Sequence, residues 1–246
     1  MPILEEFLLT GKVVFIAGDG DGHTVDLARS FAEAGAKIFV MATKYETIEN
    51  SMNAVSELKG DALGMMGDPS DSAAILEAKK SLLPLWDRID ILVNNSRFGL
   101  NKEFTETTDD DWNQLVDRNL GSARLLSRLI GKEMLSNHGG KIIHIISGLS
   151  DRGLWGSTAF SATQGAIMQL TRSLALEWAR SNIQVNAIGI GWVTDEGDDL
   201  INKYIPLKRG VNAEEICSLA VFLASDCNSF ISGSPIYIDG GLMAHP

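Results

Sequence analysis

The chain has 246 residues, of which 45% are hydrophobic, so it can bury a sizeable core, and α/β proteins of this length commonly form one domain. A net charge of −11 argues against nucleic acid or an anionic membrane as a main partner, because phosphate contacts need clustered Lys and Arg. Two cysteines, Cys217 and Cys227, form neither a disulfide framework nor a metal-ligand pattern. With no apolar run of membrane-spanning length and no secretory signal at Met1, we expect a cytoplasmic protein without a metal.

Strand-like and helix-like segments alternate along the chain. The apolar runs that predict strands are Val13–Ala17, Ile38–Ala42, Ala62–Met66, Ile89–Val93, Ile142–Ile146, Ile183–Ile188 and Pro235–Ile238. The amphipathic stretches that predict helices are Thr24–Ala34, Tyr45–Leu58, Ser72–Leu83, Asp109–Ser136, Ser157–Arg180 and Ala213–Ala224. This order predicts a single α/β domain over residues 1–246: a doubly wound, seven-stranded parallel sheet with helices on both faces.

The first strand is followed by a glycine-rich turn, Ala17-Gly-Asp-Gly-Asp-Gly-His-Thr24. Glycines at Gly18 and Gly22 allow a backbone to approach phosphates closely and a helix to pack on its strand. Asp19 and Asp21 oppose that use, since each places a negative charge where a pyrophosphate would lie. The alternative interpretation is a turn that only closes the fold.

The segment Ser157-Thr-Ala-Phe160-Ser-Ala-Thr-Gln164 resembles the Tyr-x-x-x-Lys segment of the short-chain dehydrogenases/reductases, which have a Rossmann-like fold. Phe160 and Gln164 stand at the positions of the family's tyrosine and lysine, four residues apart on one helix face. In that family the tyrosine is the acid/base, and the lysine lowers its pKa and holds the nicotinamide ribose. A phenyl ring has no proton to exchange and a carboxamide has no charge, so the resemblance implies a divergent active site.

The same resemblance extends over nearly the whole chain and implies roles for four more residues. Ser147 matches the substrate-positioning serine, and Asn119 matches the asparagine of the proton relay. Asp68 stands where the family holds the adenine, and Asn94 begins the Asn-Asn motif after the fourth strand. Members of the family often form tetramers through the two long helices, so we expect a homodimer or homotetramer. Leu125, Leu126, Leu129, Met168, Leu170 and Leu174 are the apolar residues of those helices that favour it.

The end of the second strand bears on the choice of cofactor. Met41-Ala-Thr43-Lys44 has no carboxylate to hold the ribose hydroxyls of NAD. Thr43 and Lys44 would tolerate a 2′-phosphate, so NADP is the expected cofactor if any binds, and its binding is weak or absent if Asp19 and Asp21 dominate. The alternative is that Thr43 caps the next helix and Lys44 is solvated.

Few residues can replace the missing acid. His144 is separated from Ser147 by an odd number of residues on one strand, so the two side chains face opposite ways, which predicts a structural histidine. Tyr204 and Asp195, in the irregular segment after the sixth strand, are better placed. The alternative for Tyr204 is a lid or packing residue, which is the more frequent role of an aromatic residue there. Arg97 stands where the family has a small residue and is either a substrate anchor or a solvated charge.

Three functions remain open, and the first is the preferred one because the chain resembles the family over nearly its whole length. The first is a divergent NADP-dependent oxidoreductase for the carbonyl or alcohol of a small molecule. The second is a cofactor-free lyase, dehydratase or isomerase that uses the vacated nicotinamide pocket. The third is a non-catalytic protein kept for binding or for assembly with an active relative. The wider tyrosine–lysine spacing of the family's enoyl reductases does not fit, since no lysine occurs between Lys141 and Lys203.

Overall fold

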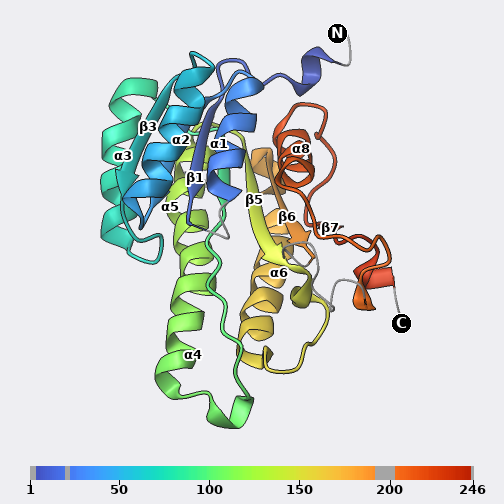
Figure 1. Cartoon of the computed structure of the whole chain (residues 1–246). Helices are drawn as coiled ribbons and strands as arrows, with labels where there is room; N and C mark the ends of the chain where they lie inside the picture. The colour runs from blue at the N-terminus through green and yellow to red at the C-terminus, as the bar shows by residue number, and fades with distance from the viewer. Residues whose placement is uncertain (1–3, 20–22, 192–202, 245–246) are drawn as a thin grey trace.

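The computed structural model describes residues 4–19, 23–191 and 203–244 and shows one seven-stranded parallel sheet between two layers of helices (Figure 1). The strand order is β3-β2-β1-β4-β5-β6-β7, and every neighbouring pair is parallel. The chain moves outward from β1 to β3 and then restarts on the other side of β1 with β4. The fold class expected from the sequence is therefore confirmed, and the point where the order reverses lies between β1 and β4.

The strands follow the expected apolar runs, with differences at their ends. Their bounds are β1 Val13–Ala17, β2 Lys37–Ala42, β3 Ala62–Met66, β4 Ile91–Asn94, β5 Gly140–Ser147, β6 Ile183–Ile190 and β7 Pro235–Ile238. β5 and β6 pair over their full length, from Gly140 beside Ile183 to Ser147 beside Ile190. The pairing with β6 carries β5 beyond its apolar run, so Ser147 becomes the last residue of a central strand.

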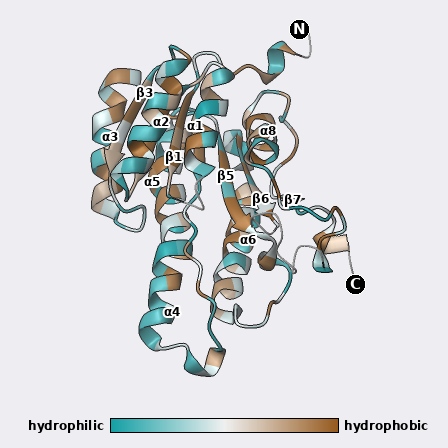
Figure 2. Ribbon diagram, viewed as in Figure 1, coloured by the Kyte–Doolittle hydropathy of each residue, from teal (hydrophilic) through white to brown (hydrophobic). Residues whose placement is uncertain are grey.

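Alternate residues of each central strand supply the two cores. Val14 and Ile16 face a core built with α1 (His23–Glu33), α2 (Tyr45–Glu57) and α8 (Ala213–Ala224). Val13 and Phe15 face a second core built with α3 (Ser72–Trp86), α5 (Ser122–Ser136) and α6 (Thr158–Trp178). Figure 2 shows the apolar strands between helices whose outer sides are polar. Burial on both faces explains why these strands read as continuous apolar runs.

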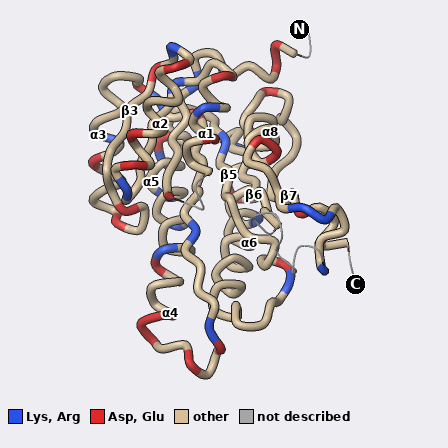
Figure 3. The backbone as a smooth tube through the Cα atoms, viewed as in Figure 1, with Lys and Arg blue, Asp and Glu red and all other residues tan. Residues whose placement is uncertain are grey.

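The predicted helix Asp109–Ser136 is interrupted, which corrects the sequence expectation. Helix α4 (Asp109–Leu115) begins with a capping box between Thr108 and Asp111 and runs into a π-helical turn, Val116–Gly121, before α5 starts. The acidic start of α4 is visible as red segments far from the sheet in Figure 3. Hydrophobic periodicity continues through such a turn and does not reveal it. A single π-helical turn inserted in a helix is frequent at functional sites.

The remaining short elements are 3₁₀ turns at Glu5–Phe7, Phe104–Glu106, Gly148–Ser150, Ala179–Ser181 and Leu242–Ala244. None of the helices in the described part of the chain has the length and apolar content that a membrane crossing requires.

The apolar residues that suggested an oligomer have another role. Leu125, Leu126 and Met168 are buried inside the chain's own core, and the half-buried Leu129, Leu170 and Leu174 pack against it. The three buried residues therefore do not support an interface, and the oligomer expected from the sequence stays a prediction. Leu176 of α6, in contrast, is 83% exposed.

Candidate functional site

A cavity of about 430 Å³ opens where the strand order reverses, at the carboxyl ends of β1, β2 and β4. Clefts at this position of a doubly wound sheet are where such folds bind nucleotides. The residues that line it are Gly18, Asp19, Thr43, Lys44, Asp68, Pro69, Ser96, Arg97, Phe98 and Arg118. Four of the six residues predicted to bind the cofactor thus lie together.

Gly18 holds the turn against the end of β4. Its φ of +111° is rare for other residues, and a Cβ there would lie 2.6 Å from the backbone of Asn95. The hydroxyl of Thr24 donates to the Gly18 carbonyl at 2.7 Å, and the amide of Asn95 donates to that hydroxyl at 3.0 Å. The turn is therefore tied both to α1 and to β4. Gly22 and Asp21, which the sequence also singled out, lie outside the described residues.

Asp19 has a role that the sequence did not reveal. Its carboxylate accepts hydrogen bonds from the Thr43 backbone N–H at 2.8 Å, from the Thr43 hydroxyl at 2.6 Å and from the Lys44 N–H at 3.3 Å. Thr43 does not cap α2, because its hydroxyl is directed to Asp19 and the capping position belongs to Lys44. The exposed Lys44 side chain lines the cavity, which agrees with a solvated lysine.

Asp68 and Asn94 shape the rest of the cleft through turns. Asp68 accepts from both the N–H and the hydroxyl of Ser70, at 2.8 and 2.7 Å. Asn94 is buried, and its carbonyl oxygen accepts from the Ser96 N–H at 3.1 Å. Its amide nitrogen lies 3.4 Å from the Nδ1 atom of His144. Asn94 therefore supports the chain that forms the cleft, and it does not line the cavity.

His144 is a structural histidine, as predicted. It is fully buried on β5, and its Nε2 atom lies 3.3 Å from the hydroxyl of Ser127 on α5. Burial lowers its pKa to about 4, so the ring is neutral at pH 7. It holds β4, β5 and α5 together and takes no part in the cleft.

Two arginines bring positive charge to the cavity. Arg97 lines it, and burial lowers the pKa of its guanidinium to about 10, so it remains charged at neutral pH. The guanidinium of Arg118, from the π-helical turn, lies 4.6 Å from the ring centre of Phe98. Such stacking fixes the position of an otherwise long and flexible side chain.

Asn119 is fixed by the π-helical turn and by the chain after β4. Its side-chain oxygen accepts from the Phe98 N–H at 2.7 Å, and its nitrogen donates to the Phe98 carbonyl at 2.9 Å. The same nitrogen donates to the hydroxyl of Thr163 on α6 at 3.2 Å. Asn119 thus bridges the cleft loop to the helix that carries Phe160 and Gln164.

Gln164 connects α6 to the end of β5. Its side chain is fully buried, and its oxygen accepts from the backbone N–H of Ser147 at 2.9 Å. Its amide nitrogen has no hydrogen-bond partner among the described residues. Ser147 keeps its hydroxyl engaged as well, since Oγ accepts from the Leu149 N–H at 3.2 Å. The half-buried Phe160 lies one turn earlier on α6 and adds no polar group.

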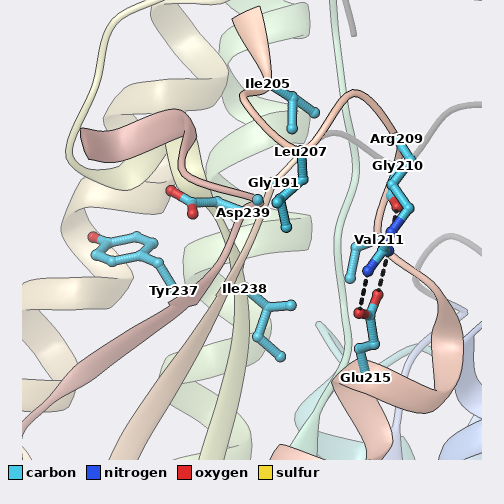
Figure 4. A pocket seen from close by; sticks show the side chains of 11 residues that line it. Gly191, Ile205, Leu207, Arg209, Gly210, Val211, Glu215, Tyr237, Ile238 and Asp239 are labelled. Atoms are coloured by element: carbon cyan, nitrogen blue, oxygen red, sulfur yellow. Dashed lines mark hydrogen bonds and ion pairs between the residues drawn. The ribbon is translucent and has the colours of Figure 1, made fainter. Parts of the chain in front are cut away.

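Two smaller cavities lie on the other side of β5. One of about 50 Å³ is lined by Ser147, Gly148, Leu149, Ile190, Gly191 and Leu242. Another of about 220 Å³ lies beyond the ends of β6 and β7, where Arg209 and Glu215 form a bidentate ion pair at its wall (Figure 4). That ion pair lowers the pKa of Glu215 to about 2.

Two other residues were expected as possible replacements for the missing acid, Tyr204 and Asp195. Tyr204 is half-buried beside the Lys203 ammonium, which lies 4.9 Å from the centre of its ring. Asp195 lies outside the described residues. The described part of the chain holds no group of three or more His, Cys, Asp or Glu side chains arranged for a metal ion.

Comparison with known proteins gives a consistent family. A family model described as enoyl-(acyl carrier protein) reductase matches residues 22–243. A 2-dehydro-3-deoxy-D-gluconate 5-dehydrogenase of Pseudoalteromonas atlantica is 35% identical over 98% of this chain and 99% of its own length. A 5-keto-D-gluconate 5-reductase of Escherichia coli is 30% identical over 96% of this chain and 97% of its own length.

Solved structures agree with the sequence relatives. A gluconate 5-dehydrogenase from Burkholderia cenocepacia, in complex with NADP and tartrate, superposes with a TM-score of 0.92 at 29% identity, covering 99% of both chains. A short-chain type dehydrogenase/reductase from Mycobacterium marinum gives 0.93 at 26% identity over the full length of both. With the fold, the family match and these relatives in agreement, the chain belongs to the short-chain dehydrogenase/reductase family.

Proposed function

We propose that this chain is a non-catalytic member of its oxidoreductase family, kept for assembly with a catalytically competent relative. The observation that carries the proposal is the state of Gln164, which stands where the family's lysine is expected. Its amide is buried and hydrogen-bonded to the Ser147 N–H, so it serves the junction of α6 and β5 and offers no charge to a bound ligand.

The chemistry of the surrounding residues supports this proposal. Oxidation of an alcohol needs a base for the hydroxyl proton, and reduction of a carbonyl needs an acid. Phe160 supplies neither, and His144 is buried against Asn94 and Ser127, away from the cavity. Losing a positioned acid/base typically lowers the rate by a factor of about 10²–10⁴. Asn119 remains, but it orients a relay whose terminal acid is missing.

The intact fold around Phe160 and Gln164 supports a role in assembly. The chain aligns with its dehydrogenase relatives over nearly their whole length, and all seven strands and the helices of both layers are present. A protein with that scaffold presents the family's outer surfaces even when its cleft does no chemistry. On α6, the exposed Leu176 is the kind of apolar residue that a partner subunit would cover.

A second candidate function is NADP-dependent carbonyl or alcohol chemistry on a small polar substrate such as a sugar acid. The cavity of about 430 Å³ at the strand-order reversal favours it, because Gly18, Asp68, Thr43 and Lys44 line the space that an adenosine would need. The named activities of the dehydrogenase and reductase relatives favour it too. Under this function Tyr204 or a water would have to replace the tyrosine.

A cofactor-free lyase receives less support. Such an enzyme would place its substrate beside Ser147, where the described residues enclose a cavity of only about 50 Å³. That volume suits a few water molecules better than a substrate.

The decisive experiment compares the chain alone with the chain co-expressed with an active family member of the same organism. We expect the chain alone to be inactive towards 5-ketogluconate with NADPH or NADH, and native mass spectrometry to detect a mixed assembly. Activity of that assembly should vanish when the relative's tyrosine is changed to phenylalanine and should survive Ser147→Ala in this chain. Turnover by the purified chain alone, lost in Ser147→Ala, would establish the second candidate instead.

A restoration variant separates the two obstacles. Phe160→Tyr with Gln164→Lys returns the acid/base and its charged partner to one face of α6, and each single change should do little, since the two groups act as a unit. We expect at most a small gain in turnover of ketones with either NADH or NADPH. A gain to a level typical of the family would show that only the pair was missing and that the cleft still binds the cofactor.

A further inference from the structure

Three hydrogen-bond donors at the end of β2 converge on one carboxylate. The Thr43 N–H, the Thr43 hydroxyl and the Lys44 N–H all donate to Asp19, at 2.8, 2.6 and 3.3 Å. Thr43 and Lys44 are exposed and Asp19 is half-buried, and all three line the same cavity of about 430 Å³. Asp19 comes from the turn after β1, so this contact joins two separate walls of the cleft.

This donor set matches the needs of a phosphate monoester. Backbone N–H groups, a hydroxyl and a nearby ammonium are the groups that hold phosphate oxygens in proteins. In doubly wound folds the end of the second strand is where the adenosine ribose is recognised, either through its 2′-hydroxyl or through a 2′-phosphate. In this chain the two carboxylate oxygens of Asp19 already occupy those donors.

We propose that Asp19 is an internal anion that closes the 2′-phosphate position of the cleft, so that the chain selects against 2′-phosphorylated adenosine. Two effects act together. A 2′-phosphate would have to displace the carboxylate from Thr43, and it would lie beside a like charge after doing so. An unphosphorylated ribose needs neither change, and its hydroxyls can donate to the carboxylate. The proposal thus departs from the expectation from sequence that Thr43 and Lys44 accommodate NADP.

This inference concerns ligand recognition only and holds whether or not the chain carries out hydride transfer. It is tested with two fragments, 2′,5′-ADP and 5′-AMP, titrated into the whole protein by calorimetry or by ligand-observed NMR. We expect the protein to bind 2′,5′-ADP no more tightly than 5′-AMP. In Asp19→Ala the donors are released, and 2′,5′-ADP should bind about 10-fold or more tightly than before, with little change for 5′-AMP.

Control variants separate the occupation of the three donors from the effect of negative charge near the cleft. Glu46→Gln removes one negative charge from the exposed first turn of α2 without touching the three donors, so it should leave the preference unchanged. Asp19→Asn keeps the shape and removes the charge, so it should give an intermediate gain and also serves if the alanine variant does not fold. Adding Thr43→Val to Asp19→Ala should abolish most of the gain, because it removes the hydroxyl donor.

The contrary outcomes are equally definite. An equal gain for both fragments, a gain in Glu46→Gln as large as that in Asp19→Ala, or no dependence on Thr43 would overturn the proposal. So would binding of neither fragment by any folded variant, since the three donors would then not form a phosphate position. Tighter binding of 2′,5′-ADP than of 5′-AMP by the unaltered protein would contradict it directly. None of these results depends on turnover, so failure here is distinguishable from failure of the proposed function.

Discussion

Replacing Gln164 by lysine should destabilise the protein, even though the resemblance read from the sequence predicts a lysine there. The Gln164 side chain is fully buried and accepts a hydrogen bond from the Ser147 N–H. Lysine has no acceptor, so that N–H loses its partner at a cost of about 1–3 kcal/mol. A buried ammonium without a carboxylate adds a desolvation cost and lowers its own pKa. We expect a total loss of about 2–4 kcal/mol at pH 7.

The assay is urea unfolding followed by circular dichroism, with Gln164→Met as the matched control. Methionine also removes the acceptor, but it adds no charge and removes the amide nitrogen that has no described partner. Its cost should therefore be smaller, about 1 kcal/mol.

The pH dependence distinguishes the two variants. A lysine whose folded pKa is depressed binds fewer protons in the folded state than in the unfolded state, so stability rises with pH until the unfolded pKa of about 10.4 is reached. The gap between Gln164→Lys and Gln164→Met should thus narrow from pH 7 to pH 10. A lysine variant as stable as the unaltered protein, or a gap independent of pH, would refute the burial of this position.

Three further predictions concern the rest of the molecule. Burial lowers the pKa of His144 from 6.5 to about 4, so between these pH values the unfolded state binds more protons, and the free energy of unfolding should fall by on the order of 3 kcal/mol as the pH drops from about 6.5 to 4. In His144→Gln, the free energy of unfolding measured by denaturation should depend less on pH across that range. Gly18→Ala should lower the free energy of unfolding by at least about 2 kcal/mol in a thermal or urea melt, because its Cβ would lie 2.6 Å from the Asn95 backbone. Gly99→Ala is the control: a Cβ there would meet no atom within 4 Å, so the free energy of unfolding should change by less than about 0.5 kcal/mol. In isolation the chain should form a homodimer or homotetramer by light scattering at micromolar concentration, and Leu176→Glu on α6 should weaken it; a monomer before any substitution would contradict this.

In the glycine turn, local sequence predicts the glycine at position 18 but not the partner of Asp19. The need for glycine at position 18 was readable from its place after a buried strand, and the structure adds the reason, the close approach of Asn95. The partner of Asp19 was not readable, because Thr43 is 24 residues away in the chain and meets Asp19 only when β1 and β2 pair. A charge that looked like simple repulsion accepts hydrogen bonds from the backbone and the hydroxyl of Thr43.

The sequence by itself determined the parallel α/β architecture and the absence of an acid/base at Phe160 and Gln164. Burial of a strand on both faces requires a run of apolar residues, which is visible in the sequence. Whether a side chain has a proton to exchange follows from the residue type. Only the tertiary structure decided that Gln164 braces Ser147, that a π-helical turn presents Asn119, and that Asp19 occupies the donors of Thr43. Each of these depends on a contact between elements distant in the chain, and hydrogen-bond geometry of that kind leaves no periodic signal in the sequence.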